Sequence, residues 1–93
     1  DAEAAAQALT PEHKLHLAGL REAYAGLATF DSDALMESLK ATAAAREVKN
    51  KVLVMPARVA CTGSKVGPSL YHLMEVLGQA EVLKRFDAAL ARM

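Results

Sequence analysis

The sequence predicts an all-α domain of about five helices joined by short connections. Apolar residues recur at spacings of three and four through most of the chain, which is the helical period. Alanine, the strongest helix former, is abundant, and Pro, Asp and Gly stand where helices should begin or end. The 93 residues fit one domain, in which we expect residues 1–9 to form a frayed tail or an extra helical turn.

The first helix is expected to begin at Thr10 and Pro11. Thr10 suits the N-cap, and proline is favoured at the first helical position because its missing N–H has no partner there anyway. The apolar residues recur on one face, which predicts an amphipathic helix. The members of that face are Leu17, Leu20, Tyr24 and Leu27, and Leu9 and Leu15 are expected to widen it.

A second helix is expected from Asp31 to about Arg46. Asp31 can accept a capping hydrogen bond, and acids in the first turn complement the positive end of the helix dipole. Its predicted buried stripe consists of Leu35, Met36, Leu39 and Ala43. The polar residues 47–51 that follow predict a loop.

The stretch from Val52 to Met55 is ambiguous, and its β-branched residues allow a short extended segment. Met55 precedes a proline, which biases it away from helix. We therefore expect Pro56 to start a short helix that runs to about Cys61 and ends at Gly63, with a glycine in the left-handed conformation.

Two further helices are expected, separated by Gly78. The pair Gly67-Pro68 should start the first, and the second should run from Gln79 to about Ala91. Their predicted buried residues are Leu70, Leu73, Met74 and Leu77 in the first, and Val82, Leu83, Phe86 and Leu90 in the second.

The formal net charge is zero, which argues against a generally basic nucleic-acid binder. The charge is unevenly distributed, however, since the window from Arg46 to Lys65 carries five cations and Glu47 as its only acid. Such a window can attract phosphate, although a solvated charged loop would look the same in the sequence. One cysteine excludes an internal disulfide and fits a reducing compartment. With no apolar run near ~18 residues and no basic leader, we expect a cytoplasmic protein without membrane contact.

No catalytic or metal-binding constellation is recognisable in the sequence. Cys61 lies in an apolar context and is expected to be a buried thiol. His13 and His16 lie three residues apart with only Glu12 nearby, so we expect surface histidines rather than a metal site, and His72 is interpreted in the same way. We therefore predict no catalytic residue, no metal ligand and no cofactor on this chain.

Arg58 and the glycine-containing loop after it are the unusual polar features. An arginine can contact a base edge or a phosphate through two parallel hydrogen bonds, and Lys65 would add a point charge. The alternative for Arg58 is an internal ion pair with Glu75 or Asp87 that fixes two helices. The residues alone leave both possibilities open.

Three motifs within Val52 to Phe86 carry a resemblance. They are M-P-x-R-V-A-x-T-G from Met55, G-P-x-L from Gly67, and L-G-x-x-x-V-L-x-R from Leu77. Together they resemble the C-terminal anticodon-binding domain of bacterial-type glutamyl-tRNA synthetases. The resemblance implies a cage of α-helices that grips the anticodon loop of tRNA-Glu. It implies RNA contacts at Met55, Pro56, Arg58, Gly67, Pro68 and Leu70. Ser64 and Lys65, in the loop between these two groups, complete the predicted RNA-binding site.

The resemblance also implies a parent enzyme, a glutamate–tRNA ligase that uses ATP and Mg²⁺. Its catalytic nucleotide-binding domain would lie outside this chain and be its partner, and we expect a monomer. Ala57 and Cys61 stand where relatives often have larger aliphatic residues, and Gly67 where some have a hydroxyl residue. Two alternatives remain at this point: a helical protein-docking module, and a free-standing tRNA-binding paralogue.

Overall fold

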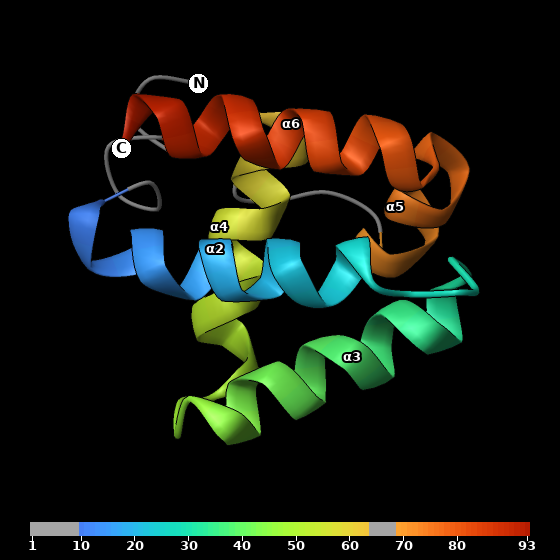
Figure 1. Ribbon diagram of the computed structural model, residues 1–93, viewed down its shortest axis with the longest axis horizontal. Helices are drawn as coiled ribbons and strands as arrows, with labels where there is room; N and C mark the ends of the chain where they lie inside the picture. Colours follow the sequence, from blue (N-terminus) through green and yellow to red (C-terminus); the bar gives the residue numbers. More distant parts are fainter. Residues whose placement is uncertain (1–9, 64–68) are drawn as a thin grey trace.

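The computed structural model describes residues 10–63 and 69–93. Within these ranges the chain forms five helices and no strand, which confirms the predicted all-α class (Figure 1). The helices are α2 (Pro11–Ala25), α3 (Ser32–Ala45), α4 (Asn50–Thr62), α5 (Leu70–Leu77) and α6 (Gln79–Arg92). None of them is long and apolar enough to cross a membrane.

Helix α2 lies at the centre of the arrangement. It packs against α6 on one side and α3 on the other, and α4 crosses behind it (Figure 1). Helix α5 packs on α3 and α6 and closes one end of the molecule. The Cα radius of gyration is 11.7 Å, close to the ~13 Å expected for a domain of about 100 residues.

Tyr24 of α2 is the centre of the core. Its ring stacks on Phe86 at a centroid distance of 6.0 Å and meets Phe30 edge-on at 5.9 Å. Its hydroxyl donates a 2.9 Å hydrogen bond to the carbonyl of Leu35, so the polar end of the buried ring is satisfied. The other large, fully buried side chains are Leu17, Leu20, Leu35, Leu39, Leu53, Met74, Val82 and Pro56.

Most predicted helix boundaries are confirmed. Pro11 is the first residue of α2, and the Asp31 side chain accepts a 2.8 Å hydrogen bond from the Ala34 amide at the start of α3. Gly63 ends α4 in the left-handed region at φ 76°, and its amide donates to the Val59 carbonyl at 2.7 Å. Thr10 occupies the N-cap of α2, but its hydroxyl lies 2.9 Å from His13 Nδ1 and makes no capping hydrogen bond.

The expectation of an extended segment followed by a helix starting at Pro56 is wrong. A single helix, α4, runs from Asn50 through Pro56 to Thr62, so the predicted loop also ends two residues early. Proline within a helix removes one backbone hydrogen bond. The helix continues because Leu53, Ala57 and Cys61, spaced four apart, all face the core. Pro56 therefore does not open a helix N-terminus.

The apolar face of α2 is narrower than predicted. Leu17, Leu20 and Tyr24 are fully buried, whereas Leu15 is 69% exposed. Leu15 precedes Leu17 by two residues, about 200° around the helix, which points it away from the core. Leu9 lies outside the described residues. Several predicted core residues are only partly buried and pack against the core from its rim: Leu27, Leu73, Leu77, Leu83 and Leu90.

Candidate nucleic-acid interface

Helix α4 has one outward side that runs its whole length. The residues on it follow each other at spacings of four, three and four, so they lie in one row. The row consists of Lys51, Met55, Arg58 and Thr62. Lys51 and Thr62 are exposed, Met55 is 41% exposed and Arg58 is half-buried. We call this row the α4 face.

The charge of Arg58 acts on Tyr71 of α5. Burial raises the pKa of the Tyr71 hydroxyl, and the positive charge of Arg58 lowers it by a smaller amount. Both carboxylates considered for an internal ion pair have other contacts. Asp87 binds the guanidinium of Arg21, and Glu75 lies 3.6 Å from His72 Nδ1.

The predicted site residues fall into three groups. Met55 and Arg58 lie on the outward α4 face. Pro56 and Leu70 are buried, Leu70 with 2% of its surface exposed, so their side chains belong to the core of the domain. The remaining four, Ser64, Lys65, Gly67 and Pro68, lie outside the described residues. The assignment of RNA contacts to all eight residues stays a prediction.

The basic window divides into structural and exposed cations. Arg46 Nε donates to His16 Nδ1 at 3.0 Å, and its guanidinium lies against Gly19, where a Cβ atom would come within 2.6 Å of it. Arg46 therefore packs between α2 and the end of α3. Lys49 and Lys51 are exposed.

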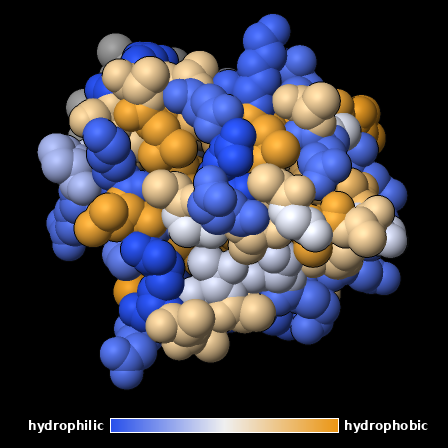
Figure 2. All heavy atoms as spheres, in the orientation of Figure 1, coloured by the Kyte–Doolittle hydropathy of each residue, from blue (hydrophilic) through white to orange (hydrophobic). Residues whose placement is uncertain are grey.

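On the face seen in Figure 2, hydrophilic residues alternate with small apolar groups.

Arg85 of α6 contacts the last turn of α4, and the sequence did not predict this contact. Its NH1 donates to the Cys61 carbonyl in the last turn of α4 at 2.5 Å, and its Nε donates to Glu81 Oε2 at 2.8 Å. Arg85 closes the L-G-x-x-x-V-L-x-R motif. Nothing in that motif indicates which helix the side chain would reach, because the contact spans 24 residues and depends on the packing of α6 against α4.

The titratable side chains of the described residues offer little catalytic chemistry. Cys61 is buried, and burial raises the pKa of its thiol to about 11, so it stays protonated at neutral pH. No group of three or more His, Cys, Asp or Glu side chains in ranges 10–63 and 69–93 could hold a metal ion. His13 contacts Thr10 and His16 accepts from Arg46, so both are engaged within the fold.

The described helices thus form an all-α domain in which α4 presents an outward face with two cations, Lys51 and Arg58. A family model described as "Anticodon binding domain" matches residues 1–90, and the chain belongs to this family. The resemblance found in the sequence motifs is therefore confirmed at the level of the family.

Individual relatives agree with this assignment. The chain is 41% identical over 91 residues to a glutamate–tRNA ligase of Nitratidesulfovibrio vulgaris and 42% identical to one of Oleidesulfovibrio alaskensis, in each case over 98% of this chain. It spans only about a fifth of those relatives, 20% of each. Among solved structures, a glutamate tRNA ligase from Elizabethkingia meningosepticum, in complex with its amino acid, matches with a TM-score of 0.91 and 30% identity. That match covers 98% of this chain and 18% of the other.

Proposed function

We propose that this domain recognises the anticodon loop of tRNA-Glu as the C-terminal part of a glutamate–tRNA ligase. The observation that carries the proposal is the match of the entire helical arrangement to a glutamate tRNA ligase, at a TM-score of 0.91 over 98% of the chain. The parent enzyme would attach glutamate to the tRNA with ATP and Mg²⁺. The described residues offer no cluster of metal ligands, so we assign that chemistry to the catalytic domain of the same enzyme.

Within this proposal, the α4 face supplies the direct contacts. Unpaired anticodon bases expose their hydrogen-bonding edges. Arg58 would donate to one of them through its planar guanidinium, and Met55 would provide apolar contact. Pro56 and Leu70 are buried, so their contribution would be to shape the surface. Ser64, Lys65, Gly67 and Pro68 would complete the site from the segment between α4 and α5, with Lys65 as a phosphate contact.

The test is binding of the isolated domain to a fluorescently labelled tRNA-Glu anticodon stem-loop, followed by anisotropy. The controls are stem-loops with the same stem and single substitutions in the anticodon. We expect tighter binding to the cognate loop. We also expect log K to fall with log salt by roughly 0.7 for each phosphate contact on single-stranded RNA. Equal affinity for all loops would overturn recognition of the anticodon.

The same titration separates the proposal from its alternatives. A protein-docking module would bind neither loop above background. A free-standing paralogue would bind the tRNA but would lack a catalytic partner, so the coding sequence preceding this domain decides between the two. A catalytic domain encoded in the same reading frame supports a glutamate–tRNA ligase, and its absence there contradicts it.

A further inference from the structure

Arg85 connects helix α4, which carries the α4 face, to helix α6. It lies on α6, yet its guanidinium donates to the Cys61 carbonyl in the last turn of α4, where the end of α4 reaches α6 (Figure 1). The same guanidinium also forms an ion pair with Glu81, one turn earlier on α6. The distance between Arg85 Nε and Glu81 Oε2 is 2.8 Å. The hydrogen bond from Arg85 lowers the pKa of the Glu81 carboxyl, so Glu81 remains charged at neutral pH.

The position of this contact has a physical reason. The last four carbonyls of a helix have no intrahelical partner and form the negative end of the helix dipole. Helix α4 has no basic residue of its own in its last turn. The Gly63 amide donates a hydrogen bond to the Val59 carbonyl, and the Arg85 guanidinium donates one to the Cys61 carbonyl from outside the helix. The cation that a helix usually carries at its own C-terminus is here supplied by α6.

The turn that Arg85 holds is also the turn that carries Arg58. The Thr62 hydroxyl donates a 2.8 Å hydrogen bond back to the Arg58 carbonyl, which closes this turn on its exposed side. Cys61, between them, is buried with 3% of its surface exposed, so its backbone is fixed by packing as well as by Arg85. Any shift of this turn against α6 would move the base of the Arg58 side chain.

We propose that Arg85 is a positioning residue for RNA recognition. By fixing the last turn of α4 against α6, it sets the direction in which Arg58 presents its guanidinium to an anticodon base. The inference rests on the proposed function and goes beyond it, because it assigns a recognition role to a residue on another helix that acts through the Cys61 carbonyl and not by touching RNA.

The decisive variant is Arg85→Met, which keeps an unbranched apolar stem and removes every donor. We expect the affinity for the cognate stem-loop to fall roughly tenfold, the scale of one charge-assisted hydrogen bond. Discrimination between anticodon variants should fall with it, and the salt dependence of binding should stay that of the wild type. A lower salt dependence would mean that Arg85 contacts a phosphate directly, which would overturn a positioning role.

Two control variants separate the Cys61 contact from other properties of Arg85. Glu81→Gln weakens the ion pair within α6 but leaves the donor to Cys61 in place, and Lys84→Met removes a neighbouring exposed cation of α6. Both should bind within about twofold of the wild type if the carbonyl contact matters, because a surface ion pair or charge contributes little. A loss equal to that of Arg85→Met in either variant would contradict the inference.

The coupling to Arg58 provides the last test. Residues that act through one another give non-additive losses, so Arg85→Met should cost little further affinity in an Arg58→Ala background. Additive losses would overturn the inference. If Arg85→Met does not fold, Arg85→Lys replaces it, since an ammonium can still reach one carbonyl, and we expect it to retain most of the anticodon discrimination. Wild-type protein that fails to bind the cognate loop would reject the proposed function itself, whereas wild-type binding with Arg85 variants unchanged would reject only the inference.

Discussion

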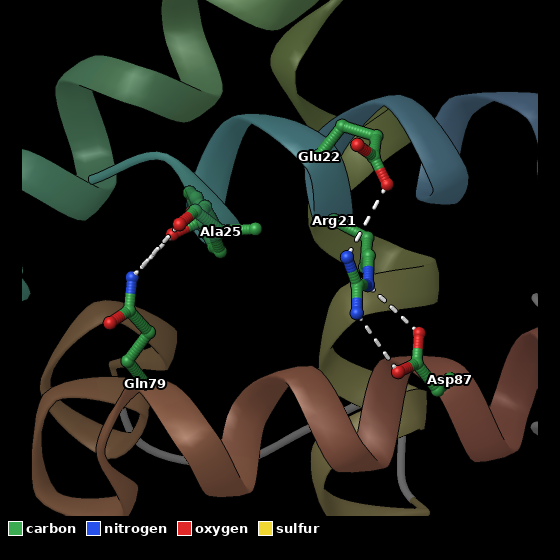
Figure 3. Close-up of polar contacts among 6 residues, drawn as sticks. Arg21, Glu22, Ala25, Gln79 and Asp87 are labelled. Atoms are coloured by element: carbon green, nitrogen blue, oxygen red, sulfur yellow. Dashed lines mark hydrogen bonds and ion pairs between the residues drawn. The ribbon is translucent and has the colours of Figure 1, made fainter.

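Arg21 of α2 and Asp87 of α6 form a two-bond ion pair on the surface of the domain, where the two helices pack side by side. Arg21 Nε donates to Asp87 Oδ1 at 2.9 Å and Arg21 NH2 donates to Oδ2 at 3.1 Å (Figure 3). The pair joins residues that are 66 positions apart on the antiparallel helices α2 and α6. The hydrogen bonds and the charge of Asp87 raise the pKa of Arg21 above its already high value, so the Arg21 guanidinium stays charged.

This relationship also bears on Arg58. Asp87 was one of two carboxylates that could have paired with Arg58 inside the fold, and it lies instead against Arg21. A second set of hydrogen bonds joins α2 and α6 at the C-terminal end of α2. The Gln79 amide nitrogen donates to the carbonyls of Tyr24 and Leu27 at 2.9 and 3.1 Å and lies 3.5 Å from that of Ala25. Gln79 thereby caps the C-terminus of α2 from the first residue of α6.

The Gln79 contact gives a prediction whose sign differs from the usual helix rule. An acid in the first turn of a helix normally stabilises it, so Gln79→Glu should help α6 considered alone. In the fold, a carboxylate would replace a donor with an acceptor facing the α2 carbonyls, and we expect a loss of about 1–3 kcal/mol in the free energy of unfolding. Urea titration measures it. A more stable Gln79→Glu variant would show that the cap contributes nothing.

Gly63 supports a prediction about backbone conformation. Its φ of 76° lies in the left-handed region, which costs a residue with a Cβ roughly 1–2 kcal/mol, and more for a β-branched one. Gly63→Val should therefore lower the melting temperature clearly. The control is Gly26→Ala, because Gly26 ends α2 at φ −88° and a Cβ there would meet the carbonyls of Ala23 and Glu22 at 3.7 and 3.9 Å, which is ordinary van der Waals contact. Equal melting temperatures for the two variants would remove the argument from Gly63.

Alkaline pH should destabilise the domain through Cys61. Burial raises the pKa of its thiol from 9.0, the value for an exposed thiol, to about 11 in the folded state. Well below pH 9.0 the thiol is protonated in both the folded and the unfolded state, and the stability is fully present. As the pH rises towards 11 the unfolded state loses its proton first, which costs about 2–3 kcal/mol.

Urea titrations from pH 8 to pH ~10.5 check this alkaline loss. Cys61→Ala should be less stable at pH 8 because it leaves a small cavity, and its stability should fall less steeply with pH. An identical pH profile in wild type and variant would exclude the thiol as the cause. Tyr24, whose pKa burial also raises, remains in both proteins and provides the common background.

Local chemistry explains which parts of the fold could be predicted. Pro11, Asp31 and Gly63 mark helix ends through properties of the single residue, and each stands where the sequence placed it. The same reasoning gave a wrong prediction at Pro56, which lies inside a helix and does not start one. Its local preference is to end or start a helix, but burial of Leu53 and Cys61 on one continuous helical face outweighs the lost hydrogen bond.

The candidate site was less predictable for a different reason. The motif around Arg58 could be recognised as a pattern, and the outward position of Met55 and Arg58 follows from helical spacing once α4 is known to be continuous. The contacts of Arg85 and Gln79 could not be found, because each joins residues far apart in the sequence through the packing of α6. Such contacts depend on the tertiary arrangement and leave no local signal.

The role of Arg58 is the central claim about recognition. If Arg58 reads a base, Arg58→Ala should keep a melting temperature near that of the wild type and bind the cognate anticodon stem-loop more weakly by about 1–3 kcal/mol. Arg58→Lys should recover little of this loss, because an ammonium cannot reproduce two parallel hydrogen bonds. Lys65→Ala is the matched control, since loss of a phosphate contact should weaken all stem-loops alike.

The most direct measurement is the affinity of wild type and Arg58→Ala for the cognate stem-loop and for each single-base anticodon variant, with melting temperatures measured in parallel. We predict that Arg58→Ala loses discrimination at one anticodon position while its melting temperature is unchanged. The contrary result is a variant that melts early, with ~3–5 kcal/mol of stability lost as for a broken buried ion pair, and still distinguishes the anticodon variants as the wild type does.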